Sequence, residues 1–259
     1  MTGLTGRFVS VAAGNSFAIA LRSDGTVWGW GDDYQGQLGN GSNDDTTTAV
    51  EVIGLTGRVT SIACGFNHSL AVMSDGSVWA WGDNGSGALG TKTQDVFQNT
   101  PVRVAGLDGG VIAVAGGTDQ SLALKADGSV WSWGVIRLPI SGASLGSDVP
   151  ASVAGIGRAT AIGAGWDIDV VLGANGSVWS WGENLGDFGS GAGGDSTTPV
   201  QAVGLPAGVT TIAVKYADVY AITANGAVWA WGSNNHGELG NGTIDPQGGS
   251  LVPVRVTGF

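Results

Sequence analysis

The sequence has few of the residues from which catalytic and metal sites are usually built. Its 259 residues include one cysteine, Cys64, and two histidines, His68 and His236. A single cysteine excludes an intrachain disulfide, and its alignment with small residues in the internal repeats indicates a buried packing residue rather than a nucleophile. No HExxH, GxSxG, Walker or GxGxxG motif occurs in the context of a preceding strand and a following helix, and "GSNDDTTT" lacks the alternating ligand spacing of a calcium loop. We therefore expect no enzyme activity, no metal and no cofactor.

The sequence is also poor in charge, and basic residues are the scarcer kind. Charged residues make up 12 %, with 10 basic against 21 acidic residues and a net charge of −11. This sign disfavours nucleic acid and anionic membranes as partners and favours a cationic partner surface. No apolar run approaches the 18 residues of a membrane span, and the first residues do not resemble a signal peptide. We expect a cytoplasmic protein, although a secreted or virion protein is compatible with these features.

Tryptophan, in contrast, is abundant and regularly placed. The string "GTVWGWG" at residues 25–31 returns four times in similar form, and these copies hold ten of the eleven tryptophans. The leading tryptophans stand at 28, 79, 131, 179 and 229, so the period is close to 50 residues. Such a period indicates a propeller or another repeat array. The small residue between the two tryptophans of each pair favours packing between repeats over ligand binding as their role.

Each tryptophan pair is preceded by Asp-Gly or Asn-Gly, which predicts a hairpin with a type I′ turn. An apolar strand lies before each turn, a short aliphatic strand before that, and a strand that usually opens on proline follows a glycine-rich loop. The sequence therefore predicts an all-β protein, a β-propeller of five four-stranded blades of about 50 residues each. The blades cover approximately residues 7–55, 58–107, 110–156, 158–205 and 208–259 of one domain.

The repeat resembles that of the regulator of chromosome condensation family. The second copy shows this best, in "SIACGFNHSLAVMSDGSVWAWGDNGSGALG" followed by "TPVRVAGL". The resemblance implies a β-propeller with a protein-binding role. Relatives include a nucleotide exchange factor for a small GTPase, a plant UV-B photoreceptor and an inhibitor of β-lactamases, so the fold does not decide the function.

The chain departs from this family in having five repeats where well-known members have seven. We favour a closed five-blade ring, in which the C-terminal strand at residues 253–256 could complete the first blade. An open arc would expose apolar faces and strand edges, and would be expected to self-associate.

Candidate partner-binding residues lie in the turns between the first and second strands, which the resemblance places on one rim of the propeller. Aromatic side chains mixed with short polar ones are typical of protein interfaces. The predicted partner-binding residues are Phe66, Asn67, His68, Asp119, Trp166, Asp167, Tyr216 and Asp218. The alternative for His68 is packing into the top of its blade.

A second surface follows the tryptophan pairs. It consists of Asp32, Asp33, Tyr34, Asn84, Asn184, Asn234 and His236. For these residues we favour turn formation through bonds from side chain to backbone over contact with a basic partner.

The leading functional hypothesis is a non-enzymatic scaffold that binds a partner protein through one rim. One alternative is an exchange factor that uses the unusual third loop "VIRLPISGASLGSD", with Asp148, as a wedge. Another is an inhibitor of a hydrolase, with Trp166 and Tyr216 as anchors. A UV-B sensor is disfavoured because the chain has one rim tryptophan and few arginines.

Overall fold

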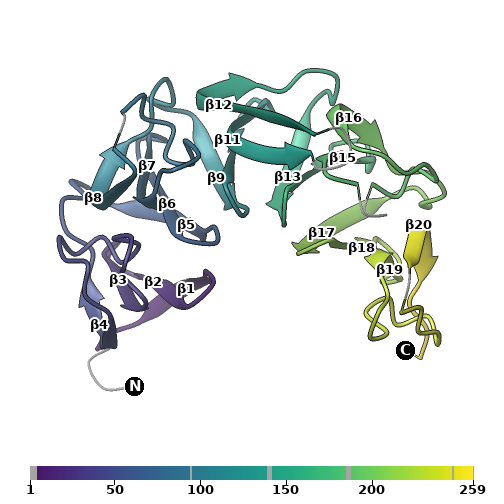
Figure 1. The fold of residues 1–259 in the computed structure, drawn as a ribbon, viewed down its shortest axis with the longest axis horizontal. Helices are drawn as coiled ribbons and strands as arrows, with labels where there is room; N and C mark the ends of the chain where they lie inside the picture. The colour runs from purple at the N-terminus through teal and green to yellow at the C-terminus, as the bar shows by residue number, and fades with distance from the viewer. Residues whose placement is uncertain (1–4, 94, 139–141, 185–187, 247, 259) are drawn as a thin grey trace. The chain divides into compact units, whose positions relative to one another are not determined.

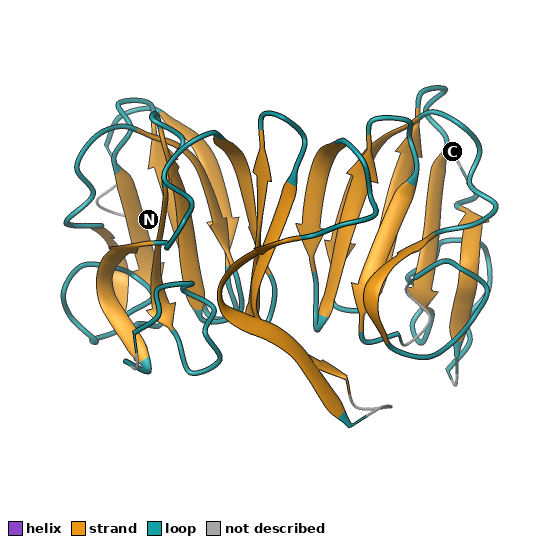
Figure 2. Ribbon diagram, turned by 90° about the horizontal axis from the view of Figure 1, so that it is seen from above, coloured by secondary structure: helices purple, strands orange, loops and turns teal. Residues whose placement is uncertain are grey.

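Strands are the only regular elements in the parts of the chain that the structure describes (Figure 2). The computed structural model describes residues 5–93, 95–138, 142–184, 188–246 and 248–258. In these residues, twenty strands form five sheets of four, and each sheet uses four consecutive strands. Within these residues, no helix is long and apolar enough to cross a membrane. The predicted all-β architecture of five four-stranded propeller blades is confirmed.

The blades follow one another along the chain, as the colours of Figure 1 show. The first blade contains β1 (Phe8–Ala13), β2 (Phe17–Arg22), β3 (Val27–Gly31) and β4 (Thr46–Glu51). The second contains β5 (Val59–Cys64), β6 (His68–Met73), β7 (Val78–Asp83) and β8 (Phe97–Arg103). The third contains β9 (Val111–Gly116), β10 (Gln120–Lys125), β11 (Val130–Leu138) and β12 (Ala143–Ser152). The fourth contains β13 (Ala159–Ala164), β14 (Ile168–Gly173), β15 (Val178–Gly182) and β16 (Ser196–Gln201). The fifth contains β17 (Val209–Lys215), β18 (Asp218–Thr223), β19 (Val228–Ser233) and β20 (Gly249–Arg255).

The chain divides into two compact units, each of which is described by itself. One unit consists of residues 1–135 with 146–152, and the other of residues 136–145 with 153–259. The arrangement of residues 1–259 as one domain with a closed ring stays a prediction.

The second strand is the most deeply buried strand of the second and fourth blades. Every residue of β6 and of β14 is buried, as expected of a strand covered on both faces. In the first unit, Ile19 and Leu21 of β2 belong to one apolar cluster with Ile62 of β5. In the second unit, Val170 and Leu172 of β14 pack in the same way with Ile212 of β17. Within each unit, the alternation of large and small apolar residues therefore packs a blade against the first strand of the next.

In the second and third blades, the second tryptophan of the pair reaches into the preceding blade. Trp81 is fully buried, and its Nε1 donates to the carbonyl oxygen of Gln37 at 2.9 Å. Trp133 donates to Ala88 at 2.8 Å in the equivalent way. A Cβ on Gly39 would lie 2.7 Å from the Trp81 nitrogen, so only glycine fits beneath the ring. The expectation that these tryptophans are packing residues is confirmed.

The hairpin turns before the tryptophan pairs are not of the predicted type I′. The amide of Gly25 donates to the Arg22 carbonyl at 2.9 Å, and Gly25 has a φ of 95°. Asp24 is not among the residues with positive φ, whereas a type I′ turn needs positive φ at both central positions. The reason is local: Asp24 Oδ1 accepts from Thr26 N at 3.1 Å and from Thr26 Oγ1 at 2.8 Å. These hydrogen bonds also lower the pKa of Asp24.

The fifth blade lacks one of these turn hydroxyls, and this leads to a stability prediction. In the fourth blade, Trp179 Nε1 donates to Ser177 Oγ at 2.8 Å. Ala227 holds the equivalent place in the fifth blade, and the buried Trp229 Nε1 has no hydrogen-bond partner among the described residues. Ala227→Ser should therefore raise the free energy of unfolding by about 1 kcal/mol, as measured by urea denaturation. Ala227→Val, which adds volume but no acceptor, is the control, and equal unfolding midpoints for both variants would contradict the prediction.

The C-terminal strand completes its own blade rather than the first one. β20 pairs with β19, with Trp229 opposite Arg255 and Ala230 opposite Val254. The first blade takes all four of its strands from residues 8–51. The prediction that the C-terminal strand could complete the first blade is therefore wrong. Pairing with the preceding strand closes a much shorter loop, which costs less chain entropy.

Candidate protein-binding rim

The turns that join the first and second strands of the blades, here called the rim turns, are linked by backbone hydrogen bonds. They comprise residues 14–16, 65–67, 117–119, 165–167 and 216–217. In the first unit, Asn15 N donates to Phe66 O, and Phe66 N donates to Gly117 O, both at 2.9 Å. In the second unit, Trp166 N donates to Tyr216 O at 3.0 Å. Within each unit, these bonds join the backbones of neighbouring rim turns.

His68, at the start of β6, lies inside the blade. It is fully buried, and its Nε2 lies 2.9 Å from Ser121 Oγ. Its ring covers Gly65, where any side chain would overlap it. Burial lowers the pKa of His68 to about 4, so the imidazole is neutral near pH 7. Its side chain therefore belongs to the core of the blade and is not available to a partner.

Three other predicted residues lie in the rim turns of the first unit. Phe66, Asn67 and Asp119 are all partly exposed. The carbonyl of Asn67 accepts from Asp83 N, and that of Asp119 accepts from Val135 N, both at 2.9 Å. The backbones of Asn67 and Asp119 are thus fixed to residues at or just after the end of each tryptophan pair. One carboxylate oxygen of Asp119 is buried.

Trp166 and Tyr216 form an exposed aromatic pair in the second unit. Their ring centroids are 6.1 Å apart with an interplanar angle of 33°, and their exposed fractions are 45 % and 54 %. Lys215 Nζ lies 4.9 Å from the centre of the Tyr216 ring, within the range of a cation–π contact. Tyr216 has a φ of 51°, a conformation that costs a non-glycine residue roughly 1–2 kcal/mol. Strain of this kind often accompanies functional sites.

Sequence reasoning did not select Lys215. The sequence feature that could have identified Lys215 is the loss of a repeated glycine. Lys215 stands where the other four repeats have Gly14, Gly65, Gly117 and Gly165. A lysine at this position places a long cationic side chain directly beside the aromatic residue that follows.

The two predicted aspartates of the second unit have different environments. Asp167 is buried, and its Oδ1 accepts from Arg137 N at 2.9 Å. This bond attaches the end of β11 to the fourth blade, so the Asp167 carboxylate is a structural anchor and not part of the exposed surface. Asp218 is partly exposed, and burial together with the nearby Glu238 carboxylate raises its pKa to about 6.

Arg137 belongs to the segment predicted as a wedge for nucleotide exchange. Ile136 and Leu138, on either side of it, are buried, so this part of the segment is packed strand. Residues 139–141 of the same segment lie outside the described residues.

The second predicted surface consists largely of turn-forming residues. Asn84 is mostly buried, and its side chain bonds to Leu89 N and to the Asp95 carbonyl. Asn184 and Asn234 make equivalent bonds. Only Tyr34 and His236 are well exposed at this surface. The role favoured for the asparagines, stabilisation of their loops, is confirmed.

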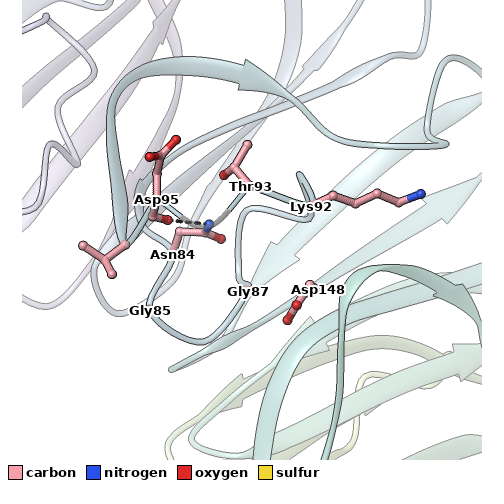
Figure 3. Close-up of a pocket in the computed structure, with 8 residues that line it drawn as sticks. Asn84, Gly85, Gly87, Lys92, Thr93, Asp95 and Asp148 are labelled. Atoms are coloured by element: carbon pink, nitrogen blue, oxygen red, sulfur yellow. Dashed lines mark hydrogen bonds between the residues drawn. The ribbon is translucent and has the colours of Figure 1, made fainter.

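A small polar pocket lies beside one of these loops in the first unit (Figure 3). Its volume is about 230 Å³, and Asn84, Lys92, Asp95 and Asp148 contribute polar groups to its lining. Pockets that hold small ligands are generally larger and mostly apolar. Figure 3 shows that the Asn84 amide in its wall is already bonded to the backbone of Asp95. The pocket therefore gives no support for a small-molecule site.

The described residues also offer no assembled metal or thiol site. Among them, no group of three or more His, Cys, Asp and Glu side chains lies close enough to hold a metal ion. Cys64 as a whole residue is partly exposed, but its thiol is surrounded by protein, which raises its pKa to about 12. The thiol is therefore protonated at neutral pH and a poor nucleophile.

Comparisons with known proteins agree with this architecture. A family model described as an RCC1-like domain matches residues 1–259. Mouse E3 ubiquitin-protein ligase HERC2 is 39 % identical over 130 residues, which cover 49 % of this chain and 3 % of that protein. Arabidopsis thaliana RCC1 domain-containing protein RUG3, mitochondrial, is 37 % identical over 133 residues, covering 51 % of this chain and 30 % of that protein. The chain thus matches less than a third of the length of these curated relatives.

The solved structures give the same result. The crystal structure of human WBSCR16 superposes with a TM-score of 0.83 at 26 % identity, over 97 % of this chain and 67 % of that one. The similarity to a solved structure thus extends over nearly the whole of the present chain.

Proposed function

Because the chain belongs to the family of RCC1-like domains, we propose that it is a non-enzymatic scaffold that binds a partner protein through its rim turns. A fold of this kind carries many functions, so the proposal depends on the rim and not on the family. The observation that carries it is the exposed Trp166–Tyr216 pair, fixed by the backbone hydrogen bond between its two turns.

The aromatic pair has the properties of an interface anchor. Tryptophan and tyrosine are enriched among the residues that contribute most to protein binding. Both rings are about half exposed, so a partner would remove a large apolar area from water. Because the supporting turns are linked through their backbones, little conformational entropy would be lost on binding.

The charge of the chain indicates the character of the partner. The net charge of −11 favours a partner with a basic surface, since complementary charge steers association. Asp119, Asp218 and Glu238 are partly exposed acidic residues within or next to the rim turns, although Asp119 and Asp218 each have one buried carboxylate oxygen. The proposed partner is therefore a protein with a basic surface around an apolar recess.

We do not propose the ligase activity of HERC2 for this chain. The match to HERC2 covers only 3 % of that ligase. Nucleotide exchange through the third loop is less well supported than the scaffold role, because Ile136 and Leu138 of that segment are packed in a strand.

The proposal predicts that removing the aromatic pair strongly weakens partner binding without unfolding the chain. Wild type and the double variant Trp166→Ala/Tyr216→Ala would be used as baits in an extract of the native host, with bound proteins quantified by mass spectrometry. Loss of two central aromatic residues should lower the affinity for a specific partner by about thirtyfold or more. Equal circular dichroism spectra and unfolding midpoints would show that the fold is retained.

Tyr34→Ala provides the matched control. Tyr34 is 80 % exposed but lies in the loop after a tryptophan pair and not in a rim turn. A partner retained by Tyr34→Ala and lost by the double variant is the expected result. A partner retained by the double variant and lost by Tyr34→Ala would place the site on the other surface.

A further inference from the structure

One loop of the first blade has an aspartate where the equivalent loops have asparagine. The position is the second residue after the glycine that closes each tryptophan pair. It is occupied by Asp33 in the first blade and by Asn84, Asn184 and Asn234 in the second, fourth and fifth. Asp33 is completely buried, and the three asparagines are nearly so. The four residues therefore occupy similar environments with different chemistry.

The asparagines use both ends of the amide to hold their loops. In the second blade, Asn84 Oδ1 accepts from Leu89 N at 3.2 Å, and Nδ2 donates to the carbonyl of Asp95 at 2.8 Å. The same two bonds recur for Asn184 and Asn234 in the other unit. The acceptor fixes the start of each loop, and the donor fixes a carbonyl eight to eleven residues further on.

Asp33 reproduces the first of these bonds and lacks the second. Its Oδ1 accepts from Leu38 N at 2.8 Å, as the asparagine oxygens do. Its Oδ2, on the side where an asparagine carries its NH₂ group, is buried and has no hydrogen-bond partner among the described residues. An ionised carboxylate can only accept hydrogen bonds, whereas a protonated one can donate. With a proton on Oδ2, Asp33 could donate a hydrogen bond from the position where asparagine has its NH₂ group.

The charges around Asp33 favour that proton. The negative charges of Asp32, Asp45 and Asp44 disfavour ionisation of the Asp33 carboxyl. Among the described residues, no basic side chain contributes to its pKa shift. Asp45 is held close by its own bond, because its Oδ1 accepts from Asp33 N at 2.9 Å. Burial together with these carboxylates raises the pKa of Asp33 to about 6. In the described residues around Asp33, no set of ligands suited to a metal ion is assembled.

We propose that Asp33 is a pH-sensitive clasp on the loop of residues 34–45, closed when its carboxyl is protonated and open when it is ionised. In the closed form, Oδ2–H donates to the far side of the loop, in the place of the asparagine amide. The loop carries the exposed Tyr34, so opening of the clasp would loosen the surface around that side chain.

The sign of the stability effect follows from the pKa. The folded-state pKa of this acid lies above its unfolded value of 3.8, so the folded state binds more protons between about pH 4 and pH 6. Stability therefore falls as the pH rises through this window, and the loss is complete above it.

The experiment compares the wild type with Asp33→Asn at pH 4.5 and pH 8. Asparagine supplies the donor at every pH, so the variant should melt about 3–6 °C above wild type at pH 8 and within about 1 °C of it at pH 4.5. Because the two proteins differ at one group, titration of Asp218 and other carboxyls cancels in the comparison. A melting difference that is the same at both pH values would overturn the proposal.

A direct titration tests the proposal without relying on a variant's stability. The ¹³C carboxyl resonance of Asp33, identified by its absence in Asp33→Asn, should titrate well above the exposed aspartates. A midpoint near 4 would overturn the proposal. Addition of calcium chloride at pH 8 tests whether a metal ion, rather than a proton, is what stabilises the Asp33 carboxyl group. If calcium raised the melting temperature of wild type but not of Asp33→Asn, the proposal would be overturned.

Asn84→Asp is the converse variant. It should acquire the same pH dependence in the second blade, melting several degrees below wild type at pH 8 and less far below it at pH 4.5.

Discussion

Replacing Trp81 by alanine should lower the free energy of unfolding by about 4 kcal/mol. The side chain is fully buried between the first two blades, so its removal leaves a cavity that the surrounding strands cannot fill. Its Nε1 is also bonded to the Gln37 carbonyl at 2.9 Å. That carbonyl keeps its bond from Ser69 Oγ, also at 2.9 Å, so loss of the ring accounts for most of the effect. Urea or thermal denaturation would measure it.

Trp166→Ala is the matched control for this prediction. The same atoms are removed, but Trp166 is 45 % exposed and lies in a rim turn. Its loss should cost about 1 kcal/mol or less. Similar losses at both positions would show that burial of the tryptophan pairs is not what stabilises the blades.

Gly82→Ala should destabilise the protein by about 3 kcal/mol or more, since two separate costs combine there. Gly82 has a φ of 97°, and a Cβ there would lie 2.5 Å from the Asn67 carbonyl oxygen and 2.8 Å from His68 Cα. The left-handed conformation alone costs alanine about 1 kcal/mol, and the clash with backbone adds the cost of overpacking. The Asn67 carbonyl cannot move freely, because it accepts from Asp83 N at 2.9 Å. The unfolding midpoint in urea measures the loss.

Gly54→Ala separates the two contributions to this cost. Gly54 has a similar φ of 83°, but nothing lies within 4 Å of the place that an alanine Cβ would occupy. It should therefore show the conformational cost of about 1 kcal/mol and nothing more. Equal losses for the two glycine variants would mean that the rim turn yields to the added methyl group.

The blade architecture was predictable because the same packing arrangement recurs along the chain, with Gly39 under Trp81, Gly90 under Trp133 and Gly189 under Trp231. A tryptophan such as Trp81 needs a glycine beneath it in the preceding blade, here Gly39, and this pairing recurs along the chain at a fixed period. Periodic constraints of this kind are visible in one sequence. The local turn geometry was not, because the choice between turn types depends on hydrogen bonds from the side chain of Asp24.

The positions of the rim turns in the sequence could be predicted, but the exposure of the predicted partner-binding side chains could be predicted only in part. His68 stands in the same column as Phe17 and Gln120, both of which are buried, and this comparison could have placed it in the core. The anchoring role of Asp167 had no such signal, because its partner Arg137 is 30 residues away in an unusual strand. Trp166 was identifiable as the one tryptophan outside the repeated pairs. Its contact with Tyr216 required three-dimensional information.

The bonds that join neighbouring rim turns within each unit affect how the sequence of these turns can change. They connect backbone atoms only, from Asn15 to Phe66 and from Phe66 to Gly117 in one unit, and from Trp166 to Tyr216 in the other. Substitution of an exposed side chain at these turns leaves the bonds intact. New recognition properties can therefore arise by point mutation without loss of the fold, and the same turns are suitable positions for a randomised library from which binders of chosen proteins are selected.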